Sequence, residues 1–162
     1  MIDIKATEQK ISAALDPATL VATYGCPAYK LRAFPGELEE LGKPINCNHV
    51  QVKFSNIQYD KYTDLKFSQK CITQINEVYF NILIQNNNLR SHTDVYEIAT
   101  AVILELRGSC LLTNLQQDII QGQSPAQITD YTFKKVANGG ACYQSEISLM
   151  NYFTDVYKAK SC

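Results

Sequence analysis

Cys47 and His49 are the residues whose types and spacing come nearest to catalytic chemistry. They lie two positions apart, which places both on one face of a strand. A cysteine beside a histidine can act as a nucleophile with its general base, but the pair also needs an orienting group and an oxyanion site. The neighbouring Asn46 and Asn48 are instead typical of turns. We therefore interpret the pair as structural, and we expect the protein not to be an enzyme.

Three acidic residues, Glu37, Glu39 and Glu40, form a second cluster with possible chemistry. They could bind a hard cation or act as paired carboxylates. A solvated acidic face at the start of a short helix explains them better, because carboxylates interact favourably with the helix dipole there. We expect no metal site in this cluster.

Arg90 and His92 flank the predicted start of a helix, where free backbone amides often hold anions. A single arginine is weak support for such a site, and Arg90 is better explained as a solvated residue or as the partner of an acid on a neighbouring subunit. The Gly139-Gly140 pair lacks the lysine of a phosphate-binding loop and lies between strands. No cofactor is therefore expected.

Six cysteines are spread widely along the chain without a C-x-x-C spacing, which argues against a zinc site. Cys71 and Cys142 lie in strand-like runs, where a reduced cysteine acts as a small apolar side chain. Cys162 is expected to be exposed.

The composition is that of one soluble domain spanning residues 1–162. The chain has a mass of 18.2 kDa. Its 15 basic and 16 acidic residues give a net charge of -1, which removes the broad positive field needed for general nucleic-acid binding. The amino-terminal residues do not form a signal peptide, and no run is long enough to span a membrane. These features predict a protein that is made and stays in the cytoplasm.

The first part of the chain predicts a helix over residues 3–15, which ends at Asp16-Pro17. Residues 18–24 are compatible with a short strand or an extended connection. Residues 29–34 alternate as a strand, and a turn then leads into a short helical turn over residues 37–41.

The middle of the chain predicts two strands and a long helix. A strand over residues 49–59 changes parity near Asn56, which indicates a bulge. Residues 70–85 are apolar on both faces and predict a central, covered strand. A capping box at residues 91–94 then opens an amphipathic helix that Gly108 ends. The apolar stripe of this helix comprises Val95, Ile98, Ala99, Val102, Ile103 and Leu106, whereas Leu104 lies off it and predicts a second contact surface.

The last part predicts a polar connection over residues 111–125 with a short helix around residues 115–119, followed by a hairpin of strands over residues 128–136 and 142–153. The fold class is accordingly α+β: a mostly antiparallel sheet of four to five strands, an N-terminal helix, one main amphipathic helix packed on the sheet, and the C-terminal hairpin. The ten tyrosines suit protein interfaces, although we expect many of them in the core.

Three segments of the chain carry a family resemblance. They are the turn at residues 33–38 before the strand from His49, the strand exit and main helix at residues 88–108, and the hairpin over residues 128–153. Together with the element order they resemble the tail-terminator, or head-tail completion, family of Mu-like contractile-tailed bacteriophages. The many cysteines and the long segment around residues 59–70 depart from that family.

The resemblance implies a structural virion protein without catalytic residues. Such a subunit forms a ring, expected to be a homohexamer, that caps the tail tube and joins it to the head connector. Its partners would be further copies of itself, the tail tube, the sheath and the connector proteins, with no membrane and no sequence-specific nucleic acid. Its location would be the virion tail, after assembly in the host cytoplasm. Another head-tail joining or tail-tube subunit, or a small cysteine-dependent enzyme, remains the alternative.

Overall fold

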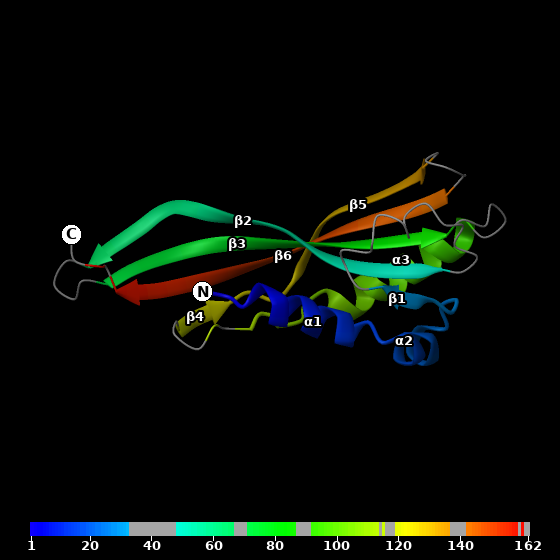
Figure 1. Ribbon diagram of the computed structural model, residues 1–162, viewed down its shortest axis with the longest axis horizontal. Coiled ribbons are helices and arrows are strands. Elements are labelled where there is room, and N and C mark those ends of the chain that lie inside the picture. Colours follow the sequence, from blue (N-terminus) through cyan, green and yellow to red (C-terminus); the bar gives the residue numbers. More distant parts are fainter. Residues whose placement is uncertain are drawn as a thin grey trace.

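The computed structural model describes residues 1–32, 48–66, 71–86, 92–113, 115, 119–136, 142–158 and 160 (Figure 1). Within these residues the chain forms three helices, α1 (Ile4–Ala14), α2 (Pro17–Tyr24) and α3 (His92–Leu106). Its strands are β1 (Lys30–Arg32), β2 (His49–Lys66), β3 (Cys71–Asn86), β4 (Ile119–Gln123), β5 (Gln127–Val136) and β6 (Cys142–Lys158).

The strands form one mixed sheet of six strands in the order β1-β2-β3-β6-β4, with β5 also paired to β6. β1 runs parallel to β2, and Lys30 lies opposite His49. The predicted fold class, a mostly antiparallel sheet of four to five strands with two helices, is therefore wrong. Strand alternation has the same period of two residues in parallel and antiparallel pairs, so it could not reveal the direction of β1.

The second helix, α2, replaces the strand or extended connection expected over residues 18–24. Asp16 caps it, because its carboxylate accepts hydrogen bonds from the backbone amide and the hydroxyl of Thr19, at 3.2 and 2.9 Å. Pro17 occupies the first turn, and Gly25 ends the helix with a left-handed φ of 66°. Aspartate followed by proline ends α1, but the same pair is also a strong start signal for the next helix.

The predicted helix at the N-terminus and the predicted bulge are both confirmed. The Asp3 carboxylate caps α1 by accepting the amide of Ala6 at 3.0 Å. The pairing of β2 with β3 shifts register between Phe54 and Asn56. β3 is central, as expected, but it is not covered on both faces throughout, because Ile75 is 43% exposed.

β6 pairs with more strands of the sheet than any other described strand does. One of its edges pairs with β3 from Tyr143 to Lys158. Its other edge pairs first with β5, which confirms the predicted hairpin, and then with β4, which begins at Ile119 where a short helix was expected. Ser124 bridges the break between β4 and β5, because its amide donates to the Tyr152 carbonyl at 2.9 Å and its hydroxyl accepts the Tyr152 amide at 2.8 Å.

The core lies between the sheet and the helices, which cover one of its faces (Figure 1). The predicted stripe of α3 is confirmed, with Ile103 half-buried and its other members fully buried. It packs on β3 and β6, whereas α1 packs on β2. The core between helices and sheet includes inward side chains of these three strands: Val50, Val52, Phe80, Ile82, Ile84, Ile147 and Leu149. The opposite face mixes apolar side chains such as Ile75 and Leu83 with polar pairs. The pairs include cross-strand hydrogen bonds from Asn81 to Glu146 at 3.0 Å and from Gln85 to Gln144 at 2.9 Å.

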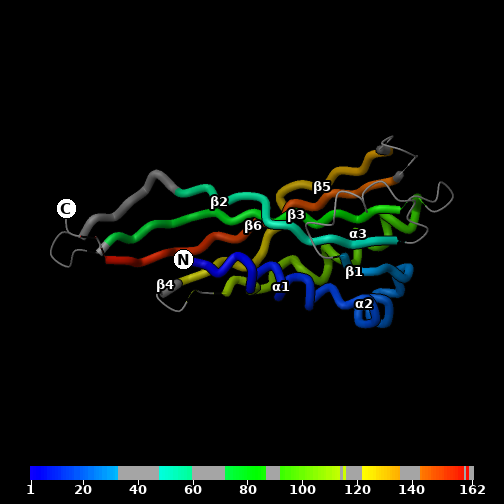
Figure 2. Tube along the Cα trace, in the orientation of Figure 1, coloured from blue at the N-terminus to red at the C-terminus, as the bar shows by residue number. Residues whose placement is uncertain are grey.

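The molecule is elongated because β2, β3 and β6 continue well past the helices (Figure 2). We call this projection the arm, and we define it by residues 72–77 of β3 and 152–158 of β6, with β2 alongside. Its base is closed on the helix side by the N-terminal segment, since the Met1 amino group lies 2.8 Å from Asp155 Oδ1. Its far end lies opposite the end of the molecule that carries α2 (Figure 1).

Candidate assembly surface

His49 is the member of the predicted cysteine–histidine pair that the structure describes, and Cys47 lies outside the described residues. β1 places Lys30 directly opposite His49. Burial lowers the pKa of the His49 imidazole, and the positive charges of Arg32 and Lys30 lower it further. The ring is therefore neutral at pH 7, in a setting whose charged neighbours are cationic.

Most of the other residues with possible chemistry also lie outside the described part: Glu37, Glu39, Glu40, Arg90, Gly139 and Gly140. His92 is described and begins α3, where its ring lies 5.5 Å from that of Tyr143 and 6.0 Å from that of Tyr96. Phe133 completes this aromatic cluster, with its ring centroid 4.4 Å from that of Tyr96. His92 thus lies at the exposed side of an aromatic cluster whose members come from α3, β5 and β6.

No group of three potential metal ligands occurs among the described residues. Cys26 is a free, buried thiol and Cys110 a free, exposed one. Cys71 and Cys142 begin β3 and β6, which confirms that both lie in strands, and Cys162 lies outside the described residues. None of the described helices is long and apolar enough to cross a membrane.

The tyrosines contribute much of the exposed apolar surface. Of the nine whose side chains the structure describes, Tyr29 alone is buried, so the expectation of many core tyrosines is wrong. Burial raises the pKa of Tyr29 strongly, and its hydroxyl donates to the Leu15 carbonyl. Six others are large exposed residues: Tyr24, Tyr59, Tyr96, Tyr131, Tyr152 and Tyr157. Contact surface of this kind, apolar with a polar tip, is typical of interfaces.

The arm carries several of these exposed side chains. Tyr59 is 50% exposed and Tyr157 is 39% exposed. Tyr157 lies opposite Ile72, and by strand alternation both belong to the sheet face that the helices cover nearer the centre. At the far end Lys66, Cys71 and Lys158 align across the three strands. The helix-covered face of the sheet therefore continues into the arm beyond the helices.

A groove of about 390 Å³ lies between α2 and α3, and we call it the α2–α3 groove. Its lining residues are Tyr24, Gly25, Cys26, Glu97, Thr100, Ala101 and Leu104. Leu104, which the sequence placed off the buried stripe, is 40% exposed here. The Tyr24 hydroxyl donates to Glu105 at 2.8 Å, and this hydrogen bond raises the pKa of Tyr24. The groove thus combines apolar side chains with acidic ones.

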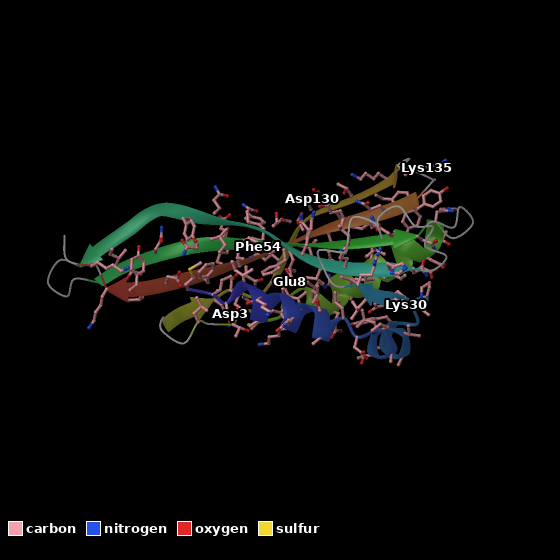
Figure 3. All side chains as sticks on the ribbon, viewed as in Figure 1. Asp3, Glu8, Lys30, Phe54, Asp130 and Lys135 are labelled. Carbon is pink, nitrogen blue, oxygen red and sulfur yellow. The ribbon has the colours of Figure 1, made fainter. Side chains whose placement is uncertain are left out.

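A second groove, of about 600 Å³, lies between α1 and the edge where β1 ends, lined among others by Lys5, Glu8 and Arg32. The opposite edge of the sheet is β5. Asp130, Lys134 and Lys135 are exposed there, and Figure 3 shows Asp130 and Lys135 on the outer side of β5. Charged side chains on an edge strand discourage unspecific pairing with other chains.

Sequence reasoning missed the arm and the α2–α3 groove. The signal for the groove was Leu104, an apolar residue off the helix stripe. The arm could not be predicted because its strand residues 60–66 and 154–158 mix polar and charged residues with apolar ones, as a loop does.

A chain of a solved virion particle is similar to this protein over most of its length. No family model matches the chain, and no curated protein matches it. A chain in the solved structure "Virion of native gene transfer agent (GTA) particle" aligns with a TM-score of 0.52 and 13% identity, covering 94% of this chain and 95% of that one. This protein shares its fold with that virion chain.

Two structures of the type 4 fimbrial biogenesis protein PilO from Pseudomonas aeruginosa also align, but much less well. Their TM-scores are 0.27 and 0.26, at 14% and 15% identity. They cover 62% and 78% of this chain, and 55% and 96% of their own chains. Likenesses this weak carry no argument about fold or function.

Proposed function

We propose that this protein is a non-enzymatic structural subunit of a phage-like virion. The observation that carries the proposal is the alignment, over nearly the whole of both chains, with a chain of a gene transfer agent virion particle. A match over 94% of this chain spans nearly all of its residues and is not confined to one common motif.

Within that class we propose a tail terminator of the Mu-like group. Such a subunit forms a ring that caps the tail tube, stops its polymerisation and presents a docking face to the head connector. The resemblance of residues 33–38, 88–108 and 128–153 supports this finer assignment. A ring requires two different surfaces on each subunit, and the arm and the α2–α3 groove are two such surfaces.

The first experiment is the solution mass of the purified chain, by light scattering over a series of concentrations, with negative-stain imaging of any large species. A closed ring, expected to hold six copies of the 18.2-kDa chain, supports the proposal. Open filaments without closed rings would instead favour a tail-tube subunit.

The decisive experiment is removal of the gene from the phage or prophage that carries it. Loss of a terminator leaves free heads and tails of uncontrolled length, whereas loss of a tube subunit leaves no tails. Unchanged particles would contradict both assignments. Replacing Cys47 and His49 by alanine is the matched control for the cysteine-enzyme alternative, because a structural subunit retains its full assembly activity without that pair.

A further inference from the structure

The end of the arm presents apolar surface that none of the described helices covers. Tyr157 lies opposite Ile72, and Tyr59 is exposed nearer the base. These positions belong to the face against which α1 and α3 pack elsewhere in the sheet. This face of the arm is therefore suited to packing against a helical surface.

The α2–α3 groove presents the complementary feature, a helical surface against which none of the described strands packs. Leu104 and Tyr24 expose apolar area at its rim, and Ala101 is buried in its floor. α2, whose C-terminal end lines the groove, lies at the end of the molecule opposite the arm (Figure 1). One chain cannot bring its own arm into its own groove, so the two surfaces can meet only between two copies.

The charges at the arm end and in the groove are opposite. The acidic residues of the arm lie nearer its base, where Glu77 accepts the Tyr79 hydroxyl and Asp155 pairs with the Met1 amino group. α2 and α3 together contain three acidic residues, Asp94, Glu97 and Glu105, and no lysine or arginine. Arg107, just beyond α3, is the nearest cation to Tyr24 that affects its pKa. The arm ends in Lys158, which is exposed, followed by the exposed Lys160. Contact of arm with arm, or of groove with groove, would bring like charges together.

We propose that the arm end of one copy docks in the α2–α3 groove of a second copy, which joins copies head to tail. The inference rests on the proposed ring-forming function and specifies its subunit joint. A head-to-tail contact is heterologous and closes into a ring when the rotation between copies closes. Tyr157 supplies the apolar anchor, and Lys158 faces Glu97 across the joint.

Two charged substitutions with matched controls test the joint. Leu104→Arg places a cation in the groove, and Leu115→Arg is its control, because Leu115 is 42% exposed and does not line the groove. Tyr157→Asp disrupts the arm end, and Tyr131→Asp is its control, at 40% exposure on β5. We expect the two test variants to need at least a tenfold higher concentration for half-maximal assembly, while the controls assemble as the wild type does. Circular dichroism and urea unfolding verify that all four variants fold.

Mixing the Tyr157→Asp chain with a Leu104→Asp chain tests the direction of the contact. The Tyr157→Asp chain retains its groove and the Leu104→Asp chain retains its arm, so one intact joint can form between them, whereas the two introduced carboxylates repel each other at the second joint. We expect a 1:1 pair and nothing larger, detected by analytical ultracentrifugation. Failure of the mixture to associate overturns the head-to-tail arrangement.

A charge exchange and a cross-link identify the contacting residues. Lys158→Glu is expected to weaken assembly, and adding Glu97→Lys in the same chain is expected to restore it. A photoreactive phenylalanine analogue at position 157 should label residues 20–26 or 97–104 of an isotopically marked second copy. Labelling of another virion protein in place of a second copy overturns the inference.

The results separate this inference from the proposed function. Rings that persist in both test variants overturn the joint and leave the terminator proposal standing. A wild-type chain that stays monomeric at every concentration overturns the joint and also the ring-forming part of the proposed function.

Discussion

The carboxylate of Glu8 in α1 accepts a hydrogen bond from the backbone amide of Phe54 in β2, at 3.0 Å. Figure 3 shows the two residues beside each other, where helix and sheet meet. β1 ends at Arg32, opposite Gln51, so among the described strands none lies beyond it to receive this amide. A side chain from a helix therefore takes the place of a strand partner.

We expect Glu8→Ala to lower the free energy of unfolding by about 1–3 kcal/mol, because it removes a hydrogen bond to a charged group and leaves the Phe54 amide without its acceptor. Glu8→Gln keeps an acceptor oxygen and should cost less. Urea unfolding measures both, with Gln9→Ala as the exposed control on the same helix. Equal stability of the Glu8→Ala and Gln9→Ala variants would show that the bond contributes nothing.

The cap of α2 gives a second test of stability. Asp16→Ala removes the carboxylate that accepts the Thr19 amide, and loss of such a cap costs about 1 kcal/mol. For a chain of this length that corresponds to a melting temperature lower by about 2–4 °C. Thr23→Ala, an exposed change in the same helix, is the control for calorimetry. If the Asp16 carboxylate did not stabilise the helix, the Asp16→Ala and Thr23→Ala variants would have the same melting temperature.

His49 predicts a dependence of stability on pH. Its pKa is lowered in the folded state, so the unfolded chain binds its proton more readily. The contribution of the neutral ring is fully present above the unfolded pKa of about 6.5. This contribution to stability declines as the pH falls below the unfolded pKa toward the lower pKa of the folded state. We expect His49→Gln to reduce the loss of stability between pH 7.5 and pH 5, measured by urea unfolding. An equal loss in the wild type and the variant would contradict this role of His49.

The two described free cysteines should differ in reactivity. Burial raises the pKa of Cys26, which is 6% exposed, whereas Cys110 is exposed. Because the thiolate is the reacting form, a brief treatment with iodoacetamide at pH 7.5 should label Cys110 well before Cys26. Peptide mass spectrometry measures both sites, and the urea-unfolded chain is the control in which the difference disappears. Equal labelling of the folded protein would contradict the buried position of Cys26.

The sequence predicted those features of the fold that depend on local periodicity. The stripe of α3, the bulge near Asn56 and the final hairpin all follow from side-chain spacing within one or two elements. The helix α2 was missed because Asp16-Pro17 was interpreted as an end signal, although its chemistry also suits a beginning. The parallel direction of β1 was missed because strand direction depends on how the chain connects distant elements, and no short pattern records that.

The candidate surface was predicted only in part. Leu104 was recognised as an apolar residue off the buried stripe, but what faces it is decided by α2, whose position depends on packing. The arm depends on long-range pairing of residues near Ile72 with residues near Tyr157. Pairing between segments so far apart in sequence leaves no periodic signal in either of them.

β6 pairs with β3 along one edge and with β4 and β5 along the other, so the sheet can be completed only after β6 has been synthesised. β3 can pair with β2 as soon as both strands are synthesised. Its other edge stays unpaired until α3, β4, β5 and finally β6 have been translated. Until that moment the apolar face around Phe80 and Ile82 has no second strand beside it. Chains with such distant pairing fold slowly and expose adhesive edges meanwhile. We therefore expect the nascent chain to be prone to aggregation and to depend on chaperones. The yield of folded subunit should fall steeply as the growth temperature rises.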